Sequence, residues 1–303
     1  MAKTAFLFPG QGAQAVGMGG QLVETLPAAR ALFDLTRETL GYDLLELCLH
    51  GPAEQLNSTV HSQPALYVCS LAALERLRAD APDAASQCAY AAGLSLGEYT
   101  ALVFAGAIDF ESGLRLVQIR GQAMQDASDA EPSGMLSILG MDLEKIEALC
   151  DAHREGEVLQ VANHLCPGNI VVSGHKTALS RIAPAAEAEG AMKVIPLAVA
   201  GAFHTSLMAP AVERLSEALA ETKIQRPRIP VVSNVDAQPH DDPEEIRDLL
   251  RRQVVTPVQW EASMRWLLGA AGVEQCFEIG PGKVLRGLLK RIERRFPCEG
   301  VEA

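Results

Sequence analysis

Hydrophobic and polar positions along this chain alternate between short apolar runs and longer stretches with helical spacing. Apolar runs at residues 4–8, 88–92, 229–232 and 273–279 predict buried strands. Within residues 111–127 the apolar positions recur every three or four residues, which predicts a helix between the second and third runs. Strands separated by helices are typical of an α/β protein.

The middle of the chain has a different order of elements. A polar segment broken by proline, residues 126–134, predicts a connection between substructures. Beyond it the pattern predicts a strand, a helix, two strands, a helix and a strand, at 135–139, 143–153, 158–162, 169–173, 176–189 and 193–197. This βαββαβ order is ferredoxin-like. We therefore expect a ferredoxin-like subdomain of residues 128–198, inserted into a larger α/β domain of residues 1–127 and 199–303, with a cleft between them.

The residues after the run at 88–92 have the spacing of a nucleophile elbow. Gly93-Leu94-Ser95-Leu96-Gly97 matches G-x-S-x-G between the predicted strand and a predicted helix at 98–105. Such a turn aims the serine hydroxyl outward beside a helix N-terminus, whose free N–H groups suit an oxyanion. The pattern indicates acyl chemistry at Ser95, and a small-residue turn without catalysis is the alternative.

Two charged or titratable residues support this chemistry. His204 lies where an apolar run turns polar, and a histidine with a pKa of about 6.5 can accept the serine proton and later return it. The chain has seven histidines, so a hydrogen-bonded surface or capping role is the alternative.

Arg120 falls on the apolar stripe of the predicted helix at 111–127. A guanidinium there needs an anion, which is either a ligand carboxylate or an Asp or Glu of the chain.

Taken in order, several motifs resemble the malonyl-CoA:acyl carrier protein transacylase family over essentially the whole chain. They are Phe8-Pro9-Gly10-Gln11-Gly12, Gln63-Pro64-Ala65, the elbow at Ser95, Arg120, Ala202-Phe203-His204, and Gln253 ahead of Pro257-Val258-Gln259-Trp260. The resemblance implies an α/β-hydrolase-like large domain with a ferredoxin-like subdomain. It also implies an enzyme of fatty acid biosynthesis that moves a malonyl group from malonyl-CoA to the phosphopantetheine thiol of acyl carrier protein through a malonyl-serine intermediate.

The resemblance assigns the catalytic roles by position. Ser95 is the nucleophile, and His204 is the base, oriented by a backbone carbonyl near Gln253 rather than by the acid of a full triad. The backbone amides of Gln11 and Leu96 form the oxyanion hole.

The resemblance also implies the substrate-binding residues. Arg120 holds the malonyl carboxylate, and the ring of Phe203 fills the space that an α-methyl branch would need, which favours malonyl over methylmalonyl. We assign Gln253, Gln63, Met124 and Asn163 to the same binding site. Asn163 is expected at the end of an inserted strand, where a turn residue is the alternative.

The chain departs from the family pattern directly before the nucleophile. Many members carry histidine there and this chain has Leu94, which affects how the base and the substrate are tuned but leaves the base itself in place.

The N-terminal glycine motif also has an alternative interpretation, which we disfavour. Gly10-Gln11-Gly12-Ala13-Gln14-Ala15 matches the dinucleotide pattern G-x-G-x-x-A, but Pro9 intervenes and no second strand ending in an acidic residue follows.

A basic helix is predicted after the turn Gly280-Pro281-Gly282. Its positive residues stand against an apolar face: Lys283, Arg286, Lys290, Arg291, Arg294 and Arg295 against Val284, Leu285, Leu288, Leu289 and Ile292. Because the resemblance implies an acidic carrier protein, this face could steer the carrier to the cleft. An ordinary solvated helix face is the alternative.

Composition excludes several other classes. A net charge of −12 argues against general nucleic-acid binding, and a hydrophobic content of 48% supports a large core. The seven cysteines are scattered without C-x-x-C pairing, which predicts a reducing compartment and no structural metal. The first apolar run is too short for a signal sequence or a membrane span. We expect a cytoplasmic monomer that needs no metal or redox cofactor.

Other functions use some of the same residues. A serine hydrolase or thioesterase would share the elbow and base but admit water, and a recruiting homologue would lack turnover. Within acyl transfer, the chain could serve a polyketide synthase as a free-standing loader, or a malonate decarboxylase system as its malonyl-transfer subunit.

Overall fold

The computed structural model describes residues 3–303, so residues 1 and 2 of the predicted large domain lie outside the described residues. A six-stranded sheet forms the centre of the larger part, in the order β10-β9-β1-β2-β7-β8. These strands are β1 (Thr4–Phe8), β2 (Cys88–Gly93), β7 (Val231–Val232), β8 (Pro239–His240), β9 (Gln275–Ile279) and β10 (Cys298–Val301). Neighbouring strands are parallel apart from the antiparallel pair β7 and β8.

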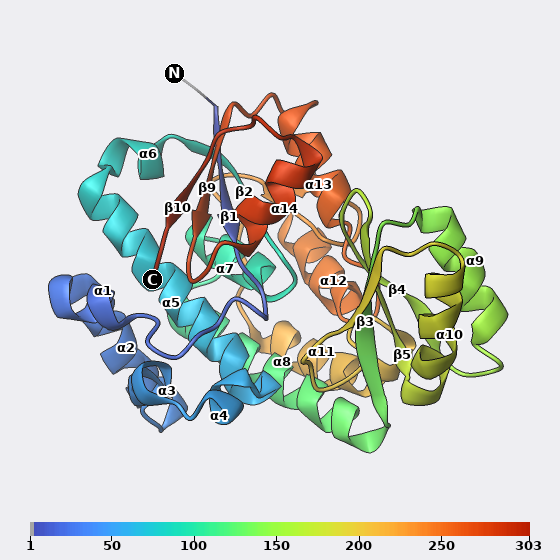
Figure 1. The fold of residues 1–303 in the computed structure, drawn as a ribbon. Helices are drawn as coiled ribbons and strands as arrows, with labels where there is room; N and C mark the ends of the chain where they lie inside the picture. Colours follow the sequence, from blue (N-terminus) through green and yellow to red (C-terminus); the bar gives the residue numbers. More distant parts are fainter. Residues whose placement is uncertain (1–2) are drawn as a thin grey trace.

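Helices surround this sheet (Figure 1). Before the insertion they are α1 (Gly20–Thr25), α2 (Pro27–Leu40), α3 (Leu44–His50), α4 (Ala53–Asn57), α5 (Thr59–Asp80), α6 (Pro82–Ser86), α7 (Leu96–Phe104) and α8 (Phe110–Ala130). After it they are the 3₁₀ turn η1 (Ser206–Met208), α11 (Ala209–Glu221), α12 (Pro243–Gln253), α13 (Trp260–Leu268) and α14 (Val284–Ile292). Of residues 3–303, no helix combines the length and the apolar character that crossing a membrane requires.

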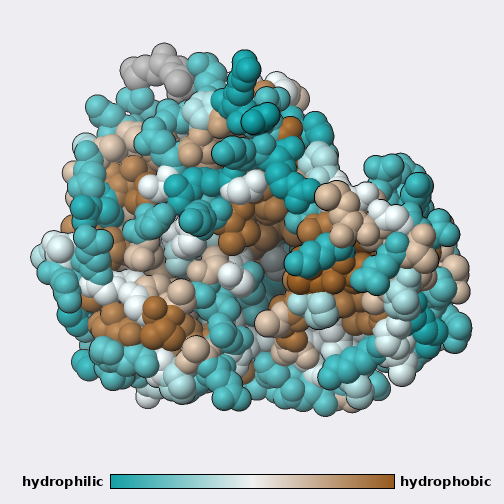
Figure 2. All heavy atoms as spheres, in the orientation of Figure 1, coloured by the Kyte–Doolittle hydropathy of each residue, from teal (hydrophilic) through white to brown (hydrophobic). Residues whose placement is uncertain are grey.

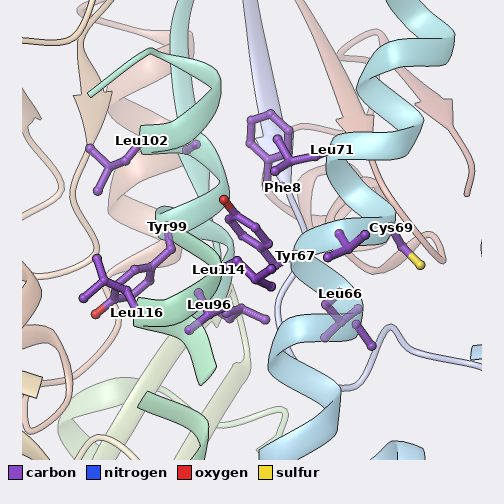
Figure 3. Packing of buried hydrophobic residues seen from close by; sticks show 14 of the residues in the cluster. Phe8, Leu66, Tyr67, Cys69, Leu71, Leu96, Tyr99, Leu102, Leu114 and Leu116 are labelled. Carbon is purple, nitrogen blue, oxygen red and sulfur yellow. The ribbon is translucent and has the colours of Figure 1, made fainter. Parts of the chain in front are cut away.

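The core of the larger part lies where α5, α7 and α8 pack together over the sheet (Figure 3). Tyr67 from α5 is fully buried, and its hydroxyl donates a hydrogen bond to the carbonyl of Phe110 at the start of α8, 2.8 Å away. Gly113 on α8 is required there, because a Cβ would lie 2.5 Å from the Tyr67 hydroxyl. This contact fixes α8, which carries Arg120, against the helix that carries Gln63.

The second sheet is built from the middle of the chain and lies to one side of the first (Figure 1). It is antiparallel in the order β4-β5-β3-β6, and α9 and α10 pack on it. Its elements are β3 (Ser133–Leu139), α9 (Leu143–His153), β4 (Leu159–Cys166), β5 (Asn169–His175), α10 (Lys176–Ala188) and β6 (Lys193–Pro196). This order and pairing confirm the predicted ferredoxin-like arrangement.

Two local predictions in this region are wrong. Residues 126–130 are not a connection, because α8 continues through buried Ala127 and Ser128 to Ala130, and only residues 131–132 separate it from β3. Asn163 is not at a strand end but inside β4, at a point where the register with β5 shifts. The domain division at 127/128 and 198/199 stays a prediction, and its first boundary falls within α8.

Candidate active site

Ser95 occupies a strained turn between β2 and α7. Its backbone has φ +50° and ψ −100°, a region that non-glycine residues rarely adopt. Two glycines allow the turn: a Cβ at Gly93 would lie 1.9 Å from the carbonyl carbon of Gly97, and a Cβ at Gly97 would lie 2.1 Å from the carbonyl oxygen of Phe8 on β1. The G-x-S-x-G spacing therefore reflects a close approach of the turn to the neighbouring strand.

His204 reaches Ser95 from the loop before η1. Its Nε2 lies 2.9 Å from Ser95 Oγ, and its Nδ1 lies 2.8 Å from the carbonyl oxygen of Gln253. Because that carbonyl can only accept, Nδ1 carries the proton and Nε2 presents its lone pair to the serine hydroxyl. Burial, and secondly the nearby charge of Arg120, lower the pKa of His204 to about 4, so the ring is neutral at pH 7.

Arg120 is fully buried beneath Ser95 and has only neutral partners. Its Nη2 donates to Ser95 Oγ at 2.9 Å and to Gln253 Oε1 at 3.0 Å, and its Nη1 donates to Gln63 Oε1 at 2.8 Å. Within residues 3–303 no carboxylate lies at ion-pair distance from this guanidinium, and its Nε has no hydrogen-bond partner. The alternative of a salt bridge within the chain is therefore wrong.

A buried cation without a counterion points to a ligand that supplies one. Burial lowers the pKa of Arg120 from its ordinary value, yet a guanidinium stays charged in proteins. Leaving that charge unpaired is costly, whereas a ligand carboxylate would match its planar donors. The cation sits within hydrogen-bond distance of the nucleophile, so the charged end of the ligand would lie next to the reacting carbonyl.

The backbone amides predicted for the oxyanion hole flank the same hydroxyl region. Leu96 begins α7, so its N–H has no acceptor within the helix. The N–H of Ser95 is already donated to Asn234 Oδ1, 2.6 Å away, which leaves Leu96 as the free donor of the turn. Gln11 lines the cleft with its backbone between Gly10 and Gly12, while its side-chain amide donates to Ser62 Oγ at 3.0 Å.

A cleft of about 300 Å³ opens over Ser95 between the two sheets. Figure 2 shows hydrophobic side chains gathered around this hollow. Its lining combines residues from both parts of the chain: Gly10, Gln11, Gly12, Leu94, Ser95, Met135, Ser137, Asn163, Leu165, Asn169, Val171, Leu197, Val199, Phe203, His204, Val284 and Leu288. A mostly apolar channel with a few polar groups suits a long flexible chain that carries amides.

The structure divides the predicted binding residues into two groups. Phe203 and Asn163 line the cleft, and the buried Oδ1 of Asn163 has no hydrogen-bond partner among residues 3–303, so it is free to accept from a ligand. Arg120, Gln63, Gln253 and Met124 are buried behind Ser95 and are not among the residues that line the cleft. Gln63 donates to Met124 Sδ at 3.6 Å and both glutamines accept from Arg120, so these residues hold the guanidinium in place.

Sequence reasoning missed two buried residues of the site. Asn234, in the loop after β7, accepts the N–H of Ser95 and donates from Nδ2 to the carbonyl of Gly93 at 2.8 Å. Glu98 on α7 accepts from Gln253 Nε2 at 2.7 Å and from the backbone N–H of Asn234 at 3.1 Å. Glu98 follows the elbow directly, and its one sequence signal is that an acidic residue stands in the first turn of a mostly apolar helix. Nothing local marks Asn234.

The sequence predicts no structural metal and no disulfide, and residues 3–303 can be compared with that prediction. Over that range no three His, Cys, Asp or Glu side chains are grouped so that they could hold a metal ion, and the seven cysteines are free. The requirement for no metal or redox cofactor stays a prediction.

The fold and this site define a serine acyltransferase, in which a nucleophile elbow and a histidine meet across a cleft. Residues 5–291 match the family model described as the acyl transferase domain. The chain is 46% identical over 298 residues to the human mitochondrial malonyl-CoA-acyl carrier protein transacylase. The alignment covers 95% of this chain and 76% of the human protein. This chain belongs to the malonyl-CoA:acyl carrier protein transacylase family.

Solved structures agree with this assignment. The acyl carrier protein S-malonyltransferase of Vibrio cholerae has a TM-score of 0.93 at 41% identity, covering 99% of this chain and 96% of that one. A malonyl-transacylase solved in complex with a type II polyketide synthase acyl carrier protein has a TM-score of 0.94 at 38% identity, covering 100% and 96% of the two chains. The predicted fold class is confirmed by these likenesses.

Proposed function

We propose that this chain transfers a malonyl group from malonyl-CoA to the phosphopantetheine thiol of an acyl carrier protein, in fatty acid biosynthesis. One observation carries this most: Arg120 is a fully buried cation with only neutral partners, and it donates directly to the nucleophile Ser95. An acyl group that ends in a carboxylate supplies the missing anion. The names of the relatives support the same donor and acceptor.

In the first half-reaction the thioester carbonyl lies over Ser95. The hydroxyl proton passes to His204 Nε2 as Ser95 Oγ bonds to the carbonyl carbon, and the N–H groups of Gln11 and Leu96 stabilise the oxyanion. The carbon–sulfur bond then breaks, and the coenzyme A thiolate takes the proton from His204. Malonyl-serine remains, with its carboxylate on Arg120.

The second half-reaction reverses these roles. The pantetheine thiol of the carrier gives its proton to His204 Nε2 while sulfur bonds to the ester carbonyl carbon, and Ser95 Oγ leaves with that proton. The malonyl carboxylate now compensates the charge of Arg120, which is one cause of the low pKa of His204. We expect the pKa of His204 to rise in malonyl-serine, which makes the ring a stronger base for the incoming thiol.

Intact mass spectrometry after brief exposure to malonyl-CoA tests the proposal, with acetyl-CoA in parallel and peptide mapping of the adduct. A malonyl adduct on Ser95 with little acetyl adduct is the expected result. Unmodified protein with released coenzyme A would favour a hydrolase. Unmodified protein with no released coenzyme A would favour another acyl donor or a recruiting homologue.

A second destination for the malonyl group is a polyketide synthase or a malonate decarboxylase system. One solved relative carries a name that pairs it with a type II polyketide synthase carrier. The same half-reactions would serve that system or a malonate decarboxylase, because each accepts the malonyl group on a pantetheine-type thiol. Comparing transfer rates to the carrier proteins of the host separates these roles.

The rate of the first half-reaction should report the low pKa of His204. Since only the neutral ring accepts a proton, we expect kcat/KM for malonyl-CoA to hold its value as pH falls from 7 to about 5 and to decline only as pH approaches 4. Stopped-flow measurement of coenzyme A release from about pH 3.5 to 8 checks this. Burial raises the pKa of Glu98 to about 7, so Glu98→Gln, which cannot titrate, is the control. A midpoint near 6.5 in both proteins would contradict the expectation.

Phe203 should set the acyl branch that fits the cleft. Its ring is 4% exposed and lies beside His204. We expect Phe203→Ser to raise kcat/KM for methylmalonyl-CoA relative to malonyl-CoA by about tenfold or more, because one methyl is worth about 1 to 3 kcal/mol in such a pocket. Val284→Ser, at the cleft mouth, is the control. An unchanged ratio would mean that the ring does not exclude the methyl group.

The basic C-terminal helix offers fewer free charges than its sequence indicates. Arg286 is an ion-pair partner of buried Glu278 and of Glu302, and Arg291 donates to the carbonyl of Pro167 at 2.9 Å. The expectation that Arg286 belongs to a solvated docking face is therefore corrected. Lys283 is exposed next to Val284 at the cleft mouth and forms no ion pair within residues 3–303.

We expect Lys283→Glu to slow malonyl transfer to an acidic carrier protein several-fold at low salt, and to slow it more than it slows release of coenzyme A from malonyl-CoA, because the carrier presents negative charge over a larger surface. Steady-state rates at about 20 mM salt, where charges are weakly screened, and at about 300 mM salt, where they are strongly screened, check this. Lys145→Glu, exposed on α9, is the control. Equal rates for both variants at low salt would remove Lys283 from the docking surface.

We further propose a monomer in the cytoplasm that needs no metal or redox cofactor. The reasons are that serine, histidine and backbone donors suffice for acyl transfer and that every group in the two half-reactions comes from this one chain.

A further inference from the structure

Glu98 is the buried acidic group of the site that the two half-reactions do not use. Its side chain lies on α7, the residue is 3% exposed, and it forms no ion pair with any lysine or arginine of the described chain. Its Oε2 accepts hydrogen bonds from Gln253 Nε2 and from the backbone N–H of Asn234, and the side chain of Ser233 also hydrogen-bonds to this carboxyl group. Burying this carboxylate without a cationic partner costs free energy, and burial raises the pKa of Glu98 to about 7, so the group is partly ionised at neutral pH.

The amide of Gln253 bridges this anion to the buried cation. Its Nε2 donates to Glu98 at 2.7 Å, and its Oε1 accepts from Arg120 Nη2 at 3.0 Å. A carboxylate only accepts and a guanidinium only donates, so the two ends demand the same orientation of the amide. Turning the amide over would set its N–H₂ against the guanidinium and its oxygen against the carboxylate, and both hydrogen bonds would be lost.

Gln253 holds more than Arg120. Its Nε2 also donates to the backbone carbonyl of Ser95 at 3.0 Å, and its own backbone carbonyl accepts from His204 Nδ1 at 2.8 Å. On the other side of Glu98, Asn234 accepts the N–H of Ser95 at 2.6 Å. Glu98 thus contacts both residues that restrain the strained turn of Ser95.

We propose that Glu98 is a positioning residue, whose acceptor oxygen fixes the Gln253 amide so that Arg120 stays aimed at the substrate carboxylate and is not neutralised by a direct ion pair. This inference rests on the proposed malonyl transfer. The amide keeps the two charges of the pocket apart, so the guanidinium has no carboxylate to release before substrate binds. A direct Glu98–Arg120 pair would compete with the malonyl group for the same donors.

Four variants test the proposal by steady-state kinetics with malonyl-CoA and acetyl-CoA: Glu98→Gln, Glu98→Met, Gln253→Met and the double variant Glu98→Met/Gln253→Met. Glu98→Gln keeps an acceptor for Gln253 and should stay within about fivefold of the natural protein. Glu98→Met removes the acceptor and should lower kcat/KM for malonyl-CoA about 10- to 100-fold and reduce the preference for malonyl over acetyl. Because Glu98 acts through Gln253, the double variant should lose little more than Gln253→Met alone.

Three results would overturn the proposal. These are unchanged malonyl preference in Glu98→Met, losses in Glu98→Met and Gln253→Met that multiply in the double variant, and a Glu98→Gln variant as impaired as Glu98→Met. Folding is checked by thermal unfolding, with Glu111→Met on α8 as the exposed control. If Glu98→Met does not fold, Glu98→Asp, which withdraws the oxygen from Gln253 but keeps the charge, must show the same loss of preference.

The natural protein in the same assay separates this inference from the proposed function. If it takes no malonyl group from malonyl-CoA, the proposed function fails first. If it is malonylated on Ser95 and the Glu98 variants keep its rate and preference, only the positioning role fails.

Discussion

Replacing Ser95 by alanine is expected to abolish the malonyl adduct and to lower transfer to the carrier protein by about 10⁴-fold or more. The reason is that the mechanism has no second nucleophile: His204 Nε2 and Arg120 Nη2 both point at Ser95 Oγ, at 2.9 Å each. Without the hydroxyl, only water or the carrier thiol can attack the thioester, and His204 has no serine proton to accept.

Mass spectrometry and single-turnover release of coenzyme A check this result. Ser216→Ala on α11 is the matched control, since that hydroxyl donates to the carbonyl of Val212 and lies outside the cleft. Substrate binding should survive in Ser95→Ala, because the guanidinium keeps its other partners Gln63 and Gln253. A persisting malonyl adduct on another residue would contradict the assignment of the nucleophile.

Local sequence patterns were sufficient for the elbow and for the second sheet. Gly93 and Gly97 flank Ser95 because β1 passes within contact of the turn, so the spacing itself encodes the geometry. The strands and helices of residues 133–196 alternate with clear period and short turns, and the helix predicted at 143–153 has the same bounds in the structure. Such signals depend on neighbours in sequence, which is why they could be predicted.

Contacts between distant segments could not be derived from spacing. His204 is 109 positions from Ser95, and the local pattern made it a candidate base but left a surface or capping role open, so the resemblance to a family was needed to select it. Asn234 and Glu98 meet across 136 positions, and neither stands out in a sequence where such residues are common. The end of α8 was placed too early because Ser128 and Asp129 suggest a loop, whereas packing of Ala127 in the core and a hydrogen bond from Ser128 Oγ to the carbonyl of Met124 extend the helix.

Replacing Arg120 by methionine is expected to change which acyl group the enzyme accepts. The guanidinium is the only cation within hydrogen-bond distance of Ser95 Oγ in residues 3–303, so its loss removes the partner of the malonyl carboxylate. Breaking one side of a buried ion pair costs about 3 to 5 kcal/mol, which lowers kcat/KM for malonyl-CoA by about 10² to 5 × 10³-fold. Acetyl-CoA has no carboxylate, so its rate should stay equal or rise, and the preference should invert.

Competition between the two donors, read by mass spectrometry of the Ser95 adduct, measures this inversion directly. Arg115→Met is the matched control, because Arg115 is exposed on the same helix and Glu111, at 3.8 Å, is its one ion-pair partner in the described part of the chain. The pKa of His204 should also rise in Arg120→Met, since the charge of Arg120 helps to lower it, and the acid limb of the acetyl-CoA rate should move to higher pH. Equal losses for both donors, with no such movement, would show that Arg120 maintains the site without binding the carboxylate.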